Sequence, residues 1–107
     1  MQRDELTRMT KIEVVIDGEH APQVKEVFAA AGARGFTGVS GVSGLGHDGY
    51  HQGGLLFNER NALELLITVV DEEHADTVIA GLRPLLDAEE GVMFVSDTYV
   101  SRPEYFR

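Results

Sequence analysis

The sequence predicts an α+β domain in which two helices cover one face of a four-stranded antiparallel sheet. Four segments are rich in β-branched residues and two others carry apolar residues at helical spacing, in the order β-α-β-β-α-β. With 107 residues, of which 43% are hydrophobic, the chain has the length and composition of one folded domain. The sequence contains no cysteine, which excludes disulfides and thiolate metal sites.

The first strand and the first helix are expected before Gly32. Residues 1–10 show no clear period and predict an N-terminal extension to a domain spanning residues 11–107. Residues 11–17 (KIEVVID) concentrate β-branched side chains and predict a strand. Pro22 suits the first turn of a helix, and Gly32 suits its C-terminal cap. This helix carries one apolar stripe, formed by Val24, Val27, Phe28 and Ala31.

The second strand is interrupted by glycine and the third is strongly apolar. Residues 36–45 (FTGVSGVSGL) resemble a strand, but Val39 and Val42 have opposite parity. This predicts either a β-bulge or a strand that is covered on both faces. Residues 46–54 are expected to form a loop. Residues 62–70 (ALELLITVV) are the strongest strand signal in the chain.

The third strand is apolar on both faces, which predicts an oligomer. Leu66 and Val70 alternate with a second apolar set, and we expect these two to lie on the sheet face away from the helices. Two helices cover only one face, so another subunit is the simplest cover for the second face. The alternating set consists of Leu63, Leu65, Ile67 and Val69.

The second helix and the last strand complete the order. Asp71 is the expected N-cap, because an acidic side chain there suits both the free N–H groups and the helix dipole. Pro84 is expected to end or kink this helix, and residues 92–100 (VMFVSDTYV) predict the last strand. The helix stripe consists of Ala75, Val78, Ile79 and Leu82. The whole order is that of the ferredoxin-like fold.

Charge and motifs exclude several classes of function. A net charge of −9 argues against nucleic-acid binding, which needs a basic surface. No segment has the features of a signal peptide or a membrane span, so a cytoplasmic protein is expected. Ser40 and Ser43 have no evident general base nearby, and no acid–base pair stands out, so we do not expect an enzyme.

The glycine-rich segment is the candidate functional region. Eight of the twelve glycines lie between Gly35 and Gly54. Glycine lets backbone N–H groups approach a ligand closely and hold a small anion, although a hairpin connection without a ligand is equally compatible. His47 and His51 have a metal-ligand spacing, but solvated histidines are the favoured interpretation in a loop. Glu64, the one charge in its strand, fits either a cleft or an exposed edge.

Three segments resemble the PII signalling superfamily. They are GARGFTGVSGVSGLG at residues 32–46, VVDEE at residues 69–73 and GVMFVSD at residues 91–97. Members of that superfamily carry similar segments in the same order, and the resemblance extends over residues 11 to 102. It implies a non-catalytic homotrimer with nucleotide clefts between neighbouring subunits and a signalling T-loop at residues 47–61.

The resemblance also implies particular site residues. The positions that match nucleotide contacts are Thr37, Gly44, Leu45, Gly46, His47, Gly91 and Arg102. The T-loop positions singled out are Asp48, Gly49, Tyr50, His51 and Arg60. No metal ligand and no catalytic residue is implied.

Departures from the superfamily pattern restrict the range of ligands that we expect. Val92 replaces a lysine, His47 an arginine, and Asp48 a glutamine that helps to hold magnesium and 2-oxoglutarate. The loss of two cations favours ADP or AMP over ATP and predicts no response to 2-oxoglutarate. The short T-loop is similar to that of compact PII-like proteins linked to bicarbonate transport and carboxysomes. This implies bicarbonate as a second ligand, and a membrane transporter or carboxysome component as partner. The alternative is a trimer of the divalent-cation tolerance type that binds metal through His47 and His51.

Overall fold

The computed structural model describes residues 5–42, 44–46, 49–51 and 62–107. Among these residues, no helix is long and apolar enough to cross a membrane. The strands are β1 Thr7–Asp17, β2 Thr37–Val42, β3 Gly44–Gly46, β4 Gly49–His51, β5 Leu63–Val70 and β6 Val92–Val100. The helices are α1 Ala21–Ala30 and α2 Glu72–Glu89, with short 3-10 helices at Gly18–His20 and Pro103–Tyr105.

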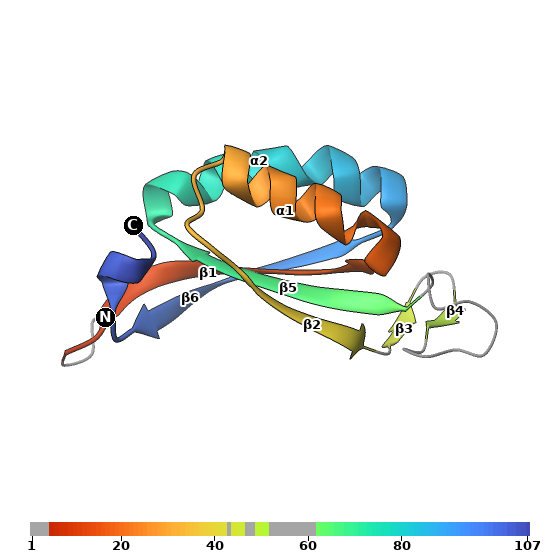
Figure 1. Cartoon of the computed structure of the whole chain (residues 1–107), viewed down its shortest axis with the longest axis horizontal. Helices are drawn as coiled ribbons and strands as arrows, with labels where there is room; N and C mark the ends of the chain where they lie inside the picture. The colour runs from red at the N-terminus through yellow and green to blue at the C-terminus, as the bar shows by residue number, and fades with distance from the viewer. Residues whose placement is uncertain (1–4, 43, 47–48, 52–61) are drawn as a thin grey trace.

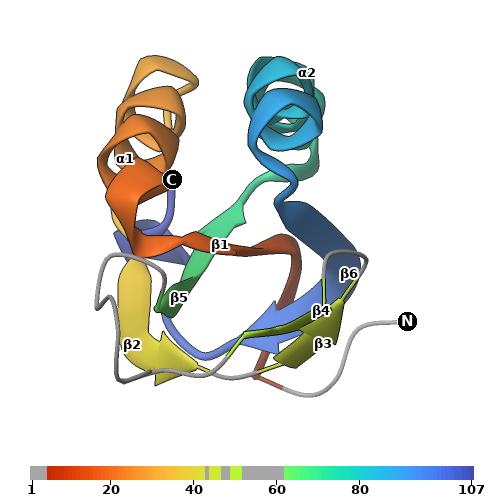
Figure 2. The same cartoon turned by 90° about the vertical axis from the view of Figure 1, so that its right-hand side faces the viewer.

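The main sheet has four strands in the order β2-β5-β1-β6, and each neighbouring pair is antiparallel. Helices α1 and α2 lie side by side over one face of this sheet (Figures 1 and 2). β3 and β4 form a separate two-stranded hairpin beyond one end of the sheet (Figure 1). This arrangement confirms the predicted ferredoxin-like fold.

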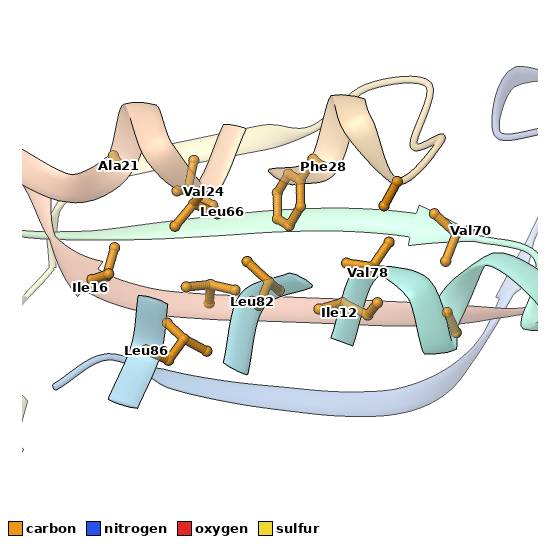
Figure 3. Close-up of a cluster of buried hydrophobic side chains, with 13 residues drawn as sticks. Ile12, Ile16, Ala21, Val24, Phe28, Leu66, Val70, Val78, Leu82 and Leu86 are labelled. Atoms are coloured by element: carbon orange, nitrogen blue, oxygen red, sulfur yellow. The ribbon is translucent and has the colours of Figure 1, made fainter. Parts of the chain in front are cut away.

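The hydrophobic core fills the space between the sheet and the helices. Alternate residues of β1 point toward the helices and are almost completely buried, and Phe28 of α1 is the largest side chain that meets them (Figure 3). Burial of each such side chain contributes about 1.5–3 kcal/mol relative to exposure. The core residues labelled in Figure 3 are Ile12, Ile16, Ala21, Val24, Phe28, Leu66, Val70, Val78, Leu82 and Leu86.

The first strand begins earlier than its sequence period indicates. β1 starts at Thr7, and its first residues pair with the end of β6, where Thr7 lies opposite Val100 and Thr10 opposite Asp97. Residues 7–10 therefore extend the strand that was predicted for residues 11–17. Their polar composition hid this, because the pairing of residues 7–9 with β6 depends on backbone hydrogen bonds, which leave no pattern in the side chains.

The predicted orientation of the third sheet strand was wrong. Leu66 and Val70 are buried beneath the helices, and the alternating set from Leu63 to Val69 lies on the open face. The register explains this, because Leu66 pairs with Val14, whose side chain is also buried under the helices. When both faces of a strand are apolar, alternation separates the two sets but does not say which one meets the helices.

The open face of the sheet carries apolar residues from β2, β5 and β6, and a charged pair from β1. Val39, Val92 and Phe94 are between 45% and 56% exposed on it. On the central strand, Lys11 Nζ lies 3.8 Å from Glu13 Oε1. The expectation of an uncovered apolar face is therefore met by a different set of residues from the one predicted.

Helix α2 does not end at Pro84, which corrects one of the two outcomes predicted for this residue, an end or a kink. It continues to Glu89, with the buried side chains of Leu82 and Leu86 on either side of the proline. Pro84 itself is exposed. Proline removes one helical hydrogen bond, and the burial of the two leucines outweighs this loss. The helix ends instead at Glu90, which adopts the left-handed conformation with φ 59°.

Candidate functional site

The glycine-rich strand β2 contains the predicted bulge. Its register against β5 shifts between Ser40 and Val42, and the extra residue, Gly41, has φ +74°. A positive φ is costly for residues with a Cβ, so glycine is required there. The bulge accounts for the opposite parity of Val39 and Val42, and the pairing of β2 with β5 ends one residue later, where Val42 lies opposite Leu63.

The hairpin that follows was only partly predicted. β3 pairs with β4 so that Gly44 lies opposite His51, Leu45 opposite Tyr50 and Gly46 opposite Gly49. The predicted loop at residues 46–54 therefore contains a strand. Its pairing could not be recognised from side-chain alternation, because glycine contributes no side chain.

Several of the predicted site residues lie outside the described residues. They are His47, Asp48 and Arg60. The alternative metal site needs both His47 and His51, so the described residues do not test it.

Two contacts that the sequence did not predict stabilise the segment at the start of β2. The buried Thr68 hydroxyl of β5 donates a hydrogen bond of 2.6 Å to the carbonyl oxygen of Gly35. The Lys25 ammonium of α1 lies 5.1 Å from the centre of the exposed Phe36 ring. Thr37, a predicted nucleotide contact, follows directly and is exposed. The one threonine within the aliphatic run LLITVV was a signal that could have identified Thr68.

Gly91 is enclosed by the core. A Cβ at this position would lie 2.6 Å from Leu86 Cδ2 and 3.1 Å from Ile16 Cγ1. Its N–H group donates a 3.0 Å hydrogen bond to the carbonyl oxygen of Leu86. Packing alone therefore explains a glycine here, whether or not the residue also contacts a nucleotide.

Arg102 lies just after β6 and remains exposed. Its guanidinium donates a 3.2 Å hydrogen bond to the Tyr105 hydroxyl and lies 5.5 Å from the centre of that ring. Two further contacts hold the tail: Arg34 donates to the carbonyl oxygen of Arg107, and Arg107 Nε lies 3.3 Å from Asp71 Oδ1. Asp71 occupies the N-cap position as predicted, but its side chain makes no capping hydrogen bond.

Two other charged groups of the sequence are now placed. Glu64 is half-buried on the helix-facing side of β5, and a Cβ on Gly18 would lie 3.5 Å from its Oε1. Near the start of α2, the donor atoms of Asp71, Glu73 and His74 lie within 4.8 Å of one another. The ion pair between Asp71 and Arg107 already engages one carboxylate of this group.

The described residues among the predicted nucleotide contacts lie at separate places in one chain. The hairpin residues Gly44–Gly46 and Gly91 lie at the end of the molecule where β2 ends and β6 begins (Figure 1). Arg102 lies at the opposite end, after Val100 has paired with Thr7 at the start of β1 (Figure 1). Thr37 lies between them at the start of β2. One chain therefore does not bring all these residues together.

Fold and site together define the class of this protein: a ferredoxin-like domain whose candidate ligand contacts come largely from glycine backbone. The chain belongs to the nitrogen regulatory protein P-II family, whose family model matches residues 9–105. Proteins of this family are signalling proteins, typically trimers that bind nucleotides. The comparison with curated proteins gave no match.

Solved structures give a more specific similarity. CPII, a nitrogen regulatory PII-like protein from Thiomonas intermedia K12 bound to ADP, AMP and bicarbonate, is 37% identical with a TM-score of 0.88. That match covers 95% of this chain and 96% of the Thiomonas chain. A PII-like signalling protein from Thermus thermophilus has a TM-score of 0.79 at 19% identity, with all of both chains covered. The Bacillus subtilis GlnK–ATP complex has a TM-score of 0.60 at 18% identity, covering 88% of this chain and 83% of that one. The last two show the common fold.

Proposed function

We propose that this protein is a non-catalytic sensor of ADP or AMP, together with bicarbonate, and that it regulates inorganic-carbon transport or carboxysome function. The observation that carries the proposal is the similarity to Thiomonas CPII, whose structure holds ADP, AMP and bicarbonate. The similarity extends over nearly the whole of both chains.

The arrangement of the candidate residues supports a cleft between subunits of a trimer. In the folded molecule, Gly44–Gly46 and Gly91 lie at the opposite end from Arg102 (Figure 1). A nucleotide that contacts both groups needs two chains. The apolar residues of the open sheet face, including Phe94 at 56% exposure, provide surface for such an association.

The chemistry of the cleft favours a nucleotide with few phosphates. Each phosphate group adds negative charge, which must be balanced locally in a protein with a net charge of −9. Val92, at the start of β6, supplies no cation beside Gly91. Arg102 is the described arginine for which the resemblance implies a phosphate contact, and a single fork-shaped guanidinium suits a diphosphate.

The proposed signal passes through residues 47–61. Glycine-rich segments lose much conformational entropy when they become ordered. A ligand that binds only one arrangement of such a segment therefore shifts its population toward that arrangement. In the proposed mechanism, nucleotide and bicarbonate set the arrangement of this T-loop, which in turn controls docking to a transporter or carboxysome component.

Calorimetry with ATP, ADP and AMP, each with and without bicarbonate, tests the proposal. We expect ADP or AMP to bind more tightly than ATP and bicarbonate to strengthen their binding. The Arg102→Ala variant should weaken ADP about tenfold or more, because it removes a charge-assisted hydrogen bond. Arg83→Ala, which removes an exposed arginine from α2, is the matched control and should bind normally. ATP binding as tight as ADP binding contradicts the stated preference, and no binding of any adenine nucleotide contradicts the function.

A further inference from the structure

Thr68 is a polar residue placed deep in an apolar core. Its side chain is 1% exposed, and it lies on the helix-facing side of β5 between the buried Leu66 and Val70. A buried hydroxyl without a partner is destabilising, and valine would fill the same space without that penalty. The hydroxyl is satisfied by its 2.6 Å hydrogen bond to the Gly35 carbonyl oxygen.

This hydrogen bond links β5 to the segment that precedes β2, outside the backbone ladder between the two strands. The pairing of β2 with β5 begins where Thr37 lies opposite Ile67. Thr68, the next residue of β5, reaches with its side chain to Gly35, two residues before the ladder starts. On the other side of the connection, the last backbone hydrogen bond to α1 joins the Ala33 N–H to the Phe28 carbonyl.

Gly35 has open space on the side where a side chain would stand. Among the described residues, no atom lies within 4 Å of the place where its Cβ would be. The residue is exposed, as are Phe36 and Thr37 after it. The Thr68 hydroxyl is the hydrogen-bond donor that holds the Gly35 carbonyl oxygen in the described structure.

We propose that Thr68 is a positioning residue for the segment Gly35–Thr37, which contains the expected nucleotide contact Thr37. This inference rests on the proposed function, because it assigns Thr68 an indirect role in the same site. The hydroxyl fixes the carbonyl of Gly35, which fixes the direction in which the chain enters β2. That direction determines where the exposed Thr37 is presented. Thr68, buried in the core, acts only through Gly35.

Two variants separate positioning from packing. Thr68→Val keeps the shape of the side chain but removes the donor, whereas Thr68→Ser keeps the donor and removes a methyl group. We expect the valine variant to bind ADP about three- to tenfold more weakly, the range that loss of one net hydrogen bond gives. The serine variant should bind like the wild-type protein, even where its thermal unfolding midpoint is lower.

A second readout does not depend on ligand. Trypsin cleaves after Arg34, directly before Gly35, and cleavage needs local opening of the chain. Without nucleotide, Thr68→Val should be cleaved there several-fold faster than wild type, and Thr68→Ser at the wild-type rate. Cleavage after Arg60 provides an internal reference in the same digest.

The outcomes are distinct. If Thr68→Val is cleaved at the wild-type rate and binds ADP with wild-type affinity, the proposal is overturned. Equal losses of ADP affinity and of protease protection in the valine and serine variants also overturn it, because they indicate packing alone. If wild-type protein does not bind ADP, the proposed function fails, while cleavage after Arg34 still decides whether Thr68 holds this segment. If Thr68→Val does not fold, Thr68→Ser and Thr68→Ala, which differ by one hydroxyl, provide the same comparison.

Discussion

The replacement of Gly91 by alanine is a direct test of how the end of α2 packs on β1. The new Cβ would lie 2.6 Å from Leu86 Cδ2, and 3.1 Å and 3.2 Å from Ile16 Cγ1 and Cδ1. Carbon atoms in contact normally lie about 3.5–4.0 Å apart. Leu86 and Ile16 are 5% and 1% exposed, so neither side chain can turn into solvent. The backbone cannot easily retreat either, because the Gly91 N–H is bonded to the Leu86 carbonyl.

The expected destabilisation follows from this crowding. One extra carbon in a closely packed core costs about 1–3 kcal/mol. In a domain of about 100 residues, each kcal/mol lowers the thermal midpoint by about 4–8 °C. We therefore expect Gly91→Ala to unfold about 5–20 °C below the wild-type protein in calorimetry or circular dichroism. The protein concentration must be held constant, because an oligomer has a concentration-dependent midpoint.

Gly35→Ala is the matched control. Among the described residues nothing lies within 4 Å of its Cβ position, and its φ is not in the left-handed region. Its midpoint should be unchanged or slightly raised, because alanine restricts the unfolded chain. A wild-type midpoint in Gly91→Ala would refute the packing argument. The test also bears on the site: weaker ADP binding in Gly91→Ala would not by itself identify a nucleotide contact.

Two further substitutions test the helix layer. A Cβ on Gly81 would lie 2.8 Å from Val27 Cγ1, where α1 and α2 approach, so Gly81→Ala should lower the thermal midpoint. In a Val27→Ala background the same change should be stabilising by about 1 kcal/mol, since only the helix propensity of alanine remains; additivity of the two changes would contradict a direct contact. Glu90 ends α2 at φ 59°, so Glu90→Gly should raise the stability by about 0.5–1 kcal/mol in denaturant titration. Glu90→Ala, which retains a Cβ, is the control, and an equal gain in both variants would rule out strain as the cause.

The order and type of the main elements could be predicted because each has its own period. The bulge in β2 was also recognisable, since Val39 and Val42 could not share a face of a regular strand. The orientation of β5 was not recognisable, because its two faces are both apolar and only the register with Val14 assigns Leu66 to the core. The continuation of α2 through Pro84 depends on the burial of Leu82 and Leu86, which is a tertiary effect.

The candidate site was less accessible to sequence reasoning. The resemblance singled out the glycine positions, Thr37 and Arg102. Their separate locations in the folded domain follow from the strand order. Gly91 was predicted as a ligand contact, and the structure adds a packing reason through Leu86. Thr68 was missed because its role depends on a partner distant in sequence, the carbonyl of Gly35.

The central position of β1 has a consequence for the way the chain folds during synthesis. β1 is made first, yet its two neighbours are β5, which begins at Leu63, and β6, which begins at Val92. Its apolar residues therefore leave the ribosome well before the strands that pair with them. Pairings between such distant segments form slowly, and strands that are still unpaired can form non-native pairs or aggregate. Helix α1, which follows β1 directly, is the first element available to shield it in the nascent chain.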